Sequence, residues 1–187
     1  MKDQITDIVS AIKEDGITAL AESGFLKVLA SNVTQQLISG PAAPIVSSIL
    51  GAAAPRINGI ILAYKQNRFE RNMTRLMAEL TKRISDLENN YNQLSVEKQE
   101  QYQHLVVEML LDSVVEERQE EKIKWGVNGF VNLMTNETNE NIMQLFFDML
   151  TDLTTLDVDT LQMYYVFSDV KWWTGIEIYR SLFLWIS

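Results

Sequence analysis

Apolar side chains recur every three or four residues along most of this chain, which is the spacing of helices with one buried face. Residues 3–13 carry the first such pattern, and Asp15-Gly16 ends it. Residues 25–38 carry the second, and Gly40-Pro41 ends it. The pattern therefore predicts short helices at the start of the chain.

The segment from Val28 to Tyr64 differs from the rest because it has no ionisable side chain between Lys27 and Arg56. Small or compact residues recur in it at every fourth position, so on a helix they would form one column. Such a column permits close contact between helices, in water or in a membrane. We predict that the segment is buried between neighbouring helices, with a kink or break at Pro55. The column consists of Ser39, Ala43, Ser47, Gly51, Pro55, Gly59 and Ala63.

A membrane helix is the alternative interpretation of this segment, which is long enough to cross a bilayer. Its polar residues, among them Asn32 and Gln35, and its prolines make it a poor membrane span. We keep the alternative that residues 36–63 insert conditionally. The insertion or close-packing face would then comprise Ala43, Ser47, Gly51, Gly59 and Ala63.

Two long helices are predicted in the middle of the chain, over residues 57–89 and 96–134. The first has apolar residues near heptad spacing, which indicates a seam packed within the monomer. The second contains Gly126 and Gly129, which each cost roughly 1 kcal/mol relative to Ala inside a helix. Close packing against another helix would justify these two glycines. The seam of the first helix consists of Leu62, Phe69, Met73, Leu76, Leu80, Ile84 and Leu87.

Charged residues mark one face of each long helix. Lys65, Arg68, Arg75 and Lys82 form a basic stripe on the first helix. We interpret it as a solvated face and keep phosphate binding as the alternative. The middle of the second helix is densely charged and either is solvated or borders a partner. Its candidate partner residues are Glu117, Glu120 and Glu121.

The last part of the chain changes character. A helix is predicted over residues 139–153, and Asp157 is the expected N-cap of one more. The final residues 164–187 hold eight aromatic side chains. Such a segment packs into the core, covers a partner or membrane interface, or continues into a longer protein. Its candidate partner residues are Trp172, Trp173, Tyr179, Phe183 and Trp185.

These patterns predict an all-α fold, an elongated bundle of six to eight helices with two long ones. The chain has 187 residues, enough for one domain with its own core. We divide it into an N-terminal region with the uncharged segment (1–56), the long helical pair (57–135) and the C-terminal helices with the aromatic tail (136–187). All three are expected to form one structural domain.

The composition of the chain excludes several kinds of functional site. The formal net charge of -9 disfavours general nucleic-acid binding, and the absence of cysteine excludes disulfides and thiol chemistry. His104 is the only histidine. Neither a serine triad nor a histidine metal site can be assembled around it. No phosphate-binding or dinucleotide-binding glycine motif occurs. We therefore predict no catalytic residue, no metal and no cofactor.

Residues 40–80, GPAAPIVSSILGAAAPRINGIILAYKQNRFERNMTRLMAEL, combine a Gly-Pro segment, an apolar turn and a basic helix. A charged helix and the segment LTTLDVDTLQMYY at 153–165 follow. This layout resembles the Abi-alpha family of bacterial abortive-infection proteins over about two thirds of the chain. The resemblance implies a prokaryotic or phage-encoded protein of phage–host conflict. Members of that family look as though they continue further, which leaves open whether this tail is complete.

We expect a non-enzymatic protein that acts by binding another protein, of the host or of the phage. Self-association and membrane association stay open as further partners. The alternatives are a membrane-acting effector that inserts residues 36–63 and an enzyme with a carboxylate metal site formed by folding. The charged N-terminus, with Lys2, Asp3 and Asp7, is unlike a secretory signal. We expect a cytoplasmic location, with a peripheral position at the membrane as the alternative.

Overall fold

The computed structural model describes residues 28, 31–58, 60, 62–136 and 138–168. Within these ranges the chain forms helices and no strand, which confirms the prediction of an all-α fold. The elements in chain order are α4 (Asn32–Leu37), α5 (Ala43–Asn58), α6 (Ala63–Lys82), α7 (Ile84–Gln93), α8 (Val96–Gln101), the π-helical turn η1 (Tyr102–Val106), α9 (Val107–Val115), α10 (Glu120–Leu133), the 3-10 turn η2 (Met134–Asn136), α11 (Glu140–Asp152) and α12 (Thr155–Ser168).

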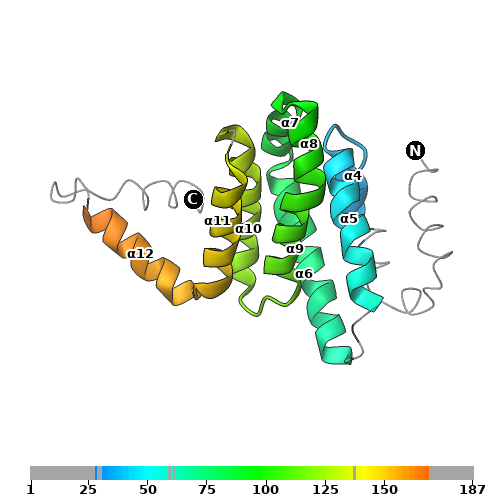
Figure 1. Cartoon of the computed structure of the whole chain (residues 1–187). Coiled ribbons are helices and arrows are strands. Elements are labelled where there is room, and N and C mark those ends of the chain that lie inside the picture. Colours follow the sequence, from blue (N-terminus) through cyan, green and yellow to red (C-terminus); the bar gives the residue numbers. More distant parts are fainter. Residues whose placement is uncertain (1–27, 29–30, 59, 61, 137, 169–187) are drawn as a thin grey trace.

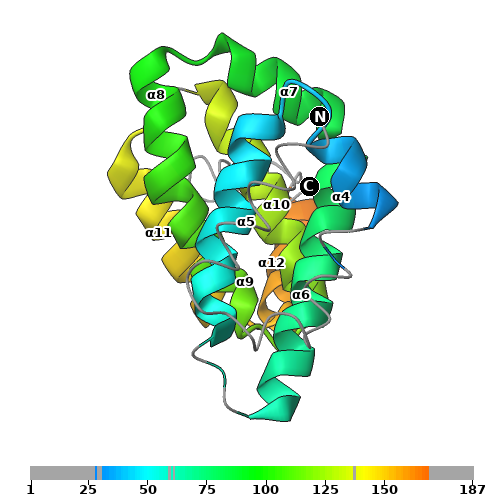
Figure 2. The ribbon, with the colours of Figure 1, turned by 90° about the vertical axis from the view of Figure 1, so that its right-hand side faces the viewer.

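Helices α9 and α10 form the centre of the molecule (Figure 1). Helix α10 packs against α6, α7, α9 and α11, whereas α9 also packs against α5. Figure 2 views the molecule from the side of α4 and α5, which cover α6 and α9 respectively. Helix α12 diverges from α11 and extends away from the rest of the bundle (Figure 1). The C-terminal helix is therefore the least enclosed of the described helices.

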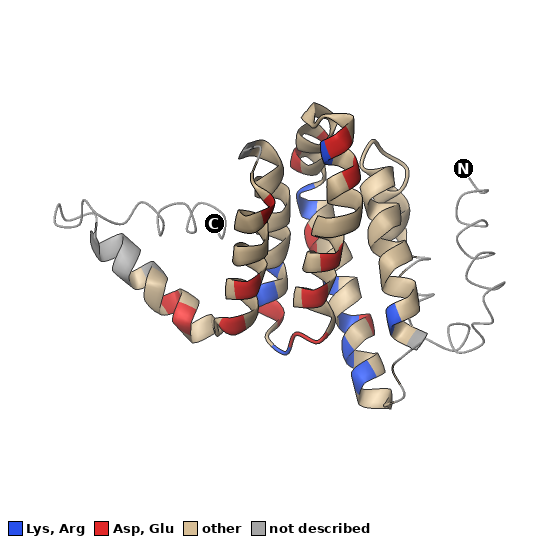
Figure 3. Cartoon of the chain, viewed as in Figure 1, with Lys and Arg blue, Asp and Glu red and all other residues tan. Residues whose placement is uncertain are grey.

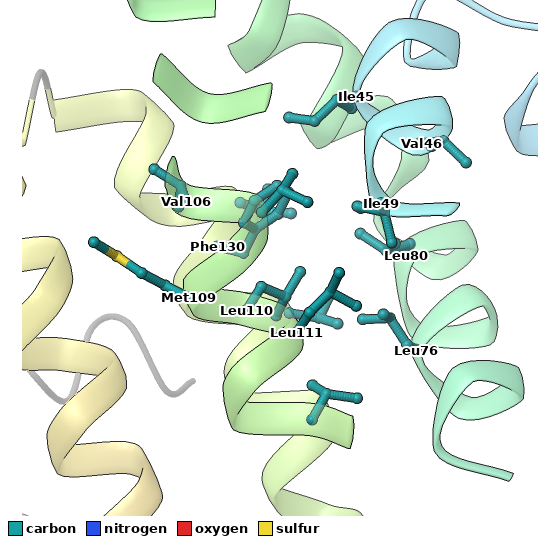
Figure 4. Packing of buried hydrophobic residues seen from close by; sticks show 14 of the residues in the cluster. Ile45, Val46, Ile49, Leu76, Leu80, Val106, Met109, Leu110, Leu111 and Phe130 are labelled. Atoms are coloured by element: carbon teal, nitrogen blue, oxygen red, sulfur yellow. The ribbon is translucent and has the colours of Figure 1, made fainter. Parts of the chain in front are cut away.

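The uncharged segment contributes the buried face of α5. Ile45, Val46, Ile49 and Ala53 are fully buried, and they belong to the hydrophobic cluster shared with α6 and α9. Figure 4 shows Ile45 and Ile49 among the buried residues of this cluster, together with Leu110 and Leu111 of α9. The prediction that this segment is packed into the body of the protein is confirmed. Branched aliphatic side chains do this packing, and the small-residue column does not.

Pro55 lies inside α5, so of the predicted kink or break, the break is wrong. The helix continues through Asn58. The carbonyl that Pro55 leaves without its helical donor belongs to Gly51, and both residues are exposed. Water can therefore replace the missing donor. Arg56 in the last turn pairs with Glu108 and Asp112, which ties α5 to α9.

The first predicted long helix is divided into α6 and α7 at Arg83, whose φ and ψ are -112° and 20°. The Arg83 guanidinium donates hydrogen bonds to Asn128 and Asn132 of α10, at 3.1 and 3.0 Å. It also pairs with Asp86 at 3.0 Å. These bonds fix the bend against α10. The predicted seam is buried from Phe69 to Leu80 and again at Leu87, whereas Leu62 is half exposed.

The prediction of one continuous helix over residues 96–134 is also wrong, because α9 ends at Val115 and α10 begins at Glu120. The fully buried amide of Asn72, on α6, caps the end of α9. Its Nδ2 donates to the carbonyls of Val114 and Glu117 at 2.8 and 2.9 Å. The turn lets α9 and α10 pack against each other.

Close packing at the two glycines of α10 is confirmed. A Cβ atom at Gly126 would lie 3.4 Å from Leu150 and 3.6 Å from Leu110. A Cβ atom at Gly129 would lie 2.1 Å from the ring of Phe146. The missing side chains therefore let α11 and α9 approach α10.

Candidate protein-interaction surface

Helix α11 has more apolar surface than the bundle covers. Asn139 caps its N-terminus by accepting a hydrogen bond from the Asn141 amide at 2.8 Å, close to the predicted start. Met143, Phe146, Phe147 and Leu150 are buried against the bundle. At 100° per residue, the remaining apolar positions widen the apolar arc to about 200°. These are Ile142 and Leu145, which are 49% and 52% exposed, and the half-buried Met149.

A capping box sets the start of α12. The Asp157 carboxylate accepts hydrogen bonds from the backbone amide and the hydroxyl of Thr154, at 2.8 and 2.7 Å. The Thr154 hydroxyl in turn accepts from the Asp157 amide at 3.2 Å. Thr154 therefore occupies the N-cap, and the prediction that Asp157 is the N-cap is wrong by one turn. The hydrogen bonds from Thr154 lower the pKa of the Asp157 carboxyl from its ordinary value of 3.8.

Helix α12 carries apolar side chains on opposite sides. Val158 is fully buried and Leu161 is half-buried on the side toward the bundle. Leu156 and Met163, seven positions apart on the other side, are 71% and 61% exposed. Helices that are apolar on all sides are normally enclosed. We call Ile142, Leu145, Leu156 and Met163 the C-terminal surface.

A polar junction holds the base of this surface. Lys122, which is 6% exposed, lies 3.0 Å from the Glu117 carboxylate and donates to the Thr151 carbonyl, also at 3.0 Å. The Gln119 side chain accepts from the Thr155 amide at 2.7 Å. The turn between α9 and α10 is thus bonded to the last turn of α11 and the first of α12. These bonds help to fix the direction in which α12 leaves the bundle.

Two of the three glutamates predicted to face a partner have a structural role. Glu117 also accepts from the amides of Arg118 and Gln119, at 2.6 and 2.8 Å, so it stabilises the turn from inside. Glu120 pairs with Arg71 at 3.0 Å. Glu121 is exposed. The prediction of a shared acidic surface is therefore wrong for Glu117, because its carboxylate points into the junction.

Three of the four side chains of the basic stripe form ion pairs, and the fourth, Arg68, donates to a backbone carbonyl. Arg75 and Lys82 lie 3.0 and 2.8 Å from the buried carboxylate of Glu79. Lys65 pairs with Glu116 at 3.5 Å, and Arg68 donates to the Glu116 carbonyl at 3.4 Å. Figure 3 shows basic and acidic residues interleaved along α6 and its neighbours. This arrangement agrees with the interpretation of the stripe as a solvated, charge-balanced face.

The predicted close contact along the small-residue column is not found. Gly51 and Ala63 are exposed, and nothing lies within 4 Å of a Cβ atom built at Gly51. Ala43 and Ser47 are half-buried, and Gly59 lies outside the described residues. The column fails as a packing face because the opposite, aliphatic face of α5 is the one that packs against α9 and η1.

Insertion of residues 36–63 into a membrane would require α5 to leave the core, since its aliphatic face is fully buried. Among the described helices, none combines the length and apolarity needed to cross a bilayer. No three histidines or carboxylates gather into a metal-sized group within the described ranges. His104 is exposed on η1. The aromatic residues Trp172, Trp173, Tyr179, Phe183 and Trp185 lie outside the described residues.

The sequence reasoning missed the C-terminal surface and the junction below it. Leu156 and Met163 were not recognisable as exposed, because spacing alone does not tell which side of a short helix meets the bundle. Lys122 lies in a run of charged residues, and the sequence does not distinguish it from a lysine exposed to solvent. A signal for the surface did exist, since α12 has apolar residues on opposite sides.

Comparisons of this chain with protein-family models, with curated proteins and with solved structures found no match.

Proposed function

We propose that this protein works in phage–host conflict by binding another protein through its C-terminal surface and the aromatic tail that follows it. Abortive infection, or a related form of defence, is the setting that the Abi-alpha resemblance suggests. The partner is a host or phage protein, and the binding takes place in the cytoplasm.

The exposure of Leu156 and Met163 carries this proposal. Leu156 and Met163 lie on one face of α12, and large apolar side chains on an exposed face are typical of protein-interaction sites. The neighbouring tail is rich in tryptophan and tyrosine, which are enriched at the centre of protein interfaces. The hydrogen bonds of the junction hold α12 in a defined direction, so the surface is presented by fixed helices.

Co-purification tests the proposal. Tagged full-length protein is isolated from phage-infected and uninfected cells, and the bound proteins are quantified. We expect one partner in stoichiometric amount, reduced at least about tenfold by Met163→Asp because burying an unpaired carboxylate opposes binding. Trp172→Ala should also weaken it.

Leu62→Asp is the matched control. Leu62 is another exposed apolar residue next to a helix start, 51% exposed, and it precedes α6 on a different part of the molecule. The Leu62→Asp variant should bind the partner as the wild type does. Equal recovery of the partner with Met163→Asp, Trp172→Ala and the wild type would contradict the proposal, as would absence of any stoichiometric partner.

A further inference from the structure

We infer that the outer apolar stripe of α11 binds a basic amphipathic helix of the partner protein. The outer stripe consists of Ile142, Leu145 and Met149. The inference rests on the proposed function, which assigns a protein partner to this part of the molecule, and it adds the chemistry of the segment that the partner contributes. It is carried by the position of the stripe on one side of α11 and by the charges beside it.

The outer stripe forms one side of a single helix. At 100° per residue, Ile142, Leu145 and Met149 lie within about 60° of one another around the axis of α11. Ile142 and Leu145 are 49% and 52% exposed, and Met149 is half-buried. The buried face of α11 begins at Phe146, next to one edge of the stripe. The stripe is about two helical turns long, which is enough for the side chains of another helix to pack between its own.

The other edge of the outer stripe is acidic. Asp148 and Asp152 follow Leu145 and Met149 by three positions, so they lie beside the stripe on the side away from the buried face. Both are exposed, and Asp148 accepts a hydrogen bond from Gln144 at 2.7 Å. Neither forms an ion pair with any residue that the structure describes. A lysine or arginine of a bound helix would therefore find an acidic side chain to pair with at this edge.

The surrounding sequence provides no positive charge. Figure 3 shows acidic and no basic residues along α11 and α12. Lys122 of α10 reaches the Thr151 carbonyl, but its charge is paired with Glu117. The stripe therefore lies in a negatively charged part of the molecule. Residues 125–170 contain no lysine or arginine and seven carboxylates, namely Glu137, Glu140, Asp148, Asp152, Asp157, Asp159 and Asp169.

These charges disfavour the other possible occupants of the stripe. A second copy that paired its own α11 with this one would bring carboxylates against carboxylates, because every charged residue of α11 is acidic. An anionic membrane or a nucleic acid would be repelled for the same reason. A basic amphipathic helix matches both features, since its apolar face packs on the stripe while its basic residues pair with Asp148 and Asp152.

Peptide binding to the full-length protein tests the inference. The probes are two fluorescent synthetic amphipathic helices with the same leucine positions, one with lysine and one with glutamate at every polar position. Fluorescence anisotropy measures the affinity of each peptide. The protein variants are Leu145→Gln and the double variant Asp148→Lys with Asp152→Lys. Glu97→Lys with Glu100→Lys is the matched control, because it reverses two exposed acidic residues of α8 and changes the net charge equally.

We expect the wild type to bind the lysine peptide and not the glutamate peptide. Leu145→Gln and the double variant on α11 should each weaken binding of the lysine peptide at least about tenfold, whereas the α8 control should weaken it much less. Equal weakening by the two double variants would overturn the inference, because the peptide would then respond to net charge alone. Equal affinity for the two peptides, or no binding of the lysine peptide, would overturn it too. Circular dichroism confirms that each variant is folded.

Co-purification separates failure of this inference from failure of the proposed function. A stoichiometric partner that is recovered equally with the wild type and with the double variant on α11 would overturn the inference alone. Absence of any stoichiometric partner would contradict the proposed function, whatever the peptides show. A partner that is lost with the double variant and retained with the α8 control would support both.

Discussion

The ring of Phe146 on α11 lies against the backbone of Gly129 on α10, and a Cβ atom built at Gly129 would lie 2.1 Å from two of its carbons. The ring also meets Phe147 edge-on, with centroids 5.1 Å apart. Phe146 is therefore confined from two sides. This contact sets how closely α11, and the C-terminal surface that it carries, approaches the bundle.

Substitution of Gly129 by Ala should destabilise the protein by about 1–3 kcal/mol, because the added methyl group forces the ring or the helix to shift. Gly51→Ala is the matched control, since Gly51 also lies inside a helix but has open space around it. That change should stabilise by about 1 kcal/mol, the difference in helix propensity. Urea unfolding measures both. Equal effects at the two positions would contradict this account of Gly129.

Loss of the Lys122 ammonium should be costly because Glu117, with a side chain 11% exposed, would keep a nearly buried charge without its partner. We expect Lys122→Met to destabilise by about 3–5 kcal/mol. The double change with Glu117→Gln should recover part of that loss, since it removes the uncompensated charge. Denaturant unfolding of both single variants and the double variant gives the coupling energy. Additive effects would show that the two side chains do not depend on each other.

The sequence predicts those features of the fold that depend on residues close together in the chain. The helical spacing is local, and so are the start of α11 near Asn139 and the cost of Gly126 and Gly129, and these predictions agree with the structure. The division of the second long helix is not local. It depends on the Asn72 amide, which comes from α6 and bonds to carbonyls more than 40 residues later. Spacing cannot reveal such a contact.

The prediction that the small-residue column is a packing face was wrong because the sequence alone does not show which face of α5 meets its neighbours. Both faces of α5 were plausible packing faces, one small and one branched. Burying Ile49 and its aliphatic neighbours removes far more apolar area from water than burying Gly51. The aliphatic face of α5 therefore packs against α9 and η1, whereas Gly51 on the small face is exposed. Of the candidate sites, the basic stripe was found from spacing and carries ion pairs in the structure, whereas Leu156 and Met163 were missed.

Tyr102 provides a prediction about pH. It is 1% exposed, packs edge-on against Phe130, and its hydroxyl has no hydrogen-bond partner among the described residues. Burial raises the pKa of Tyr102 above its ordinary value of 10.0. The folded protein thus resists ionisation that the unfolded chain undergoes, so its stability should fall as the pH rises above about 10.

The variant Tyr102→Phe should lack the part of the stability loss at alkaline pH that comes from ionisation of the tyrosine. Near neutral pH the variant should be unchanged or more stable by up to about 1 kcal/mol, because it removes an unpaired buried hydroxyl. Urea unfolding at neutral and alkaline pH measures both effects. A variant that is clearly destabilised at neutral pH would mean that the hydroxyl has a partner.

The capping box of α12 should be sensitive to acid. The pKa of Asp157 is lowered by its hydrogen bonds from Thr154, so its contribution is present above the ordinary pKa and is lost as the pH falls through the folded value. We expect the first turn of α12 to fray in acid, seen as faster amide hydrogen exchange at residues 155–158 after correction for pH. Asp157→Asn should fray already at neutral pH, whereas Asp159→Asn, at an exposed site two residues further on, should not.

The most direct test of the C-terminal surface is protection against phage, measured as plating efficiency on cells that express each variant at equal level. Leu156→Asp and Val96→Asp are compared, because both residues lie in the first turn of a helix and are 71% and 72% exposed. We predict that Val96→Asp protects like the wild type and that Leu156→Asp loses protection. Full protection by Leu156→Asp, or equal loss by both, would contradict the claim that this surface carries the function.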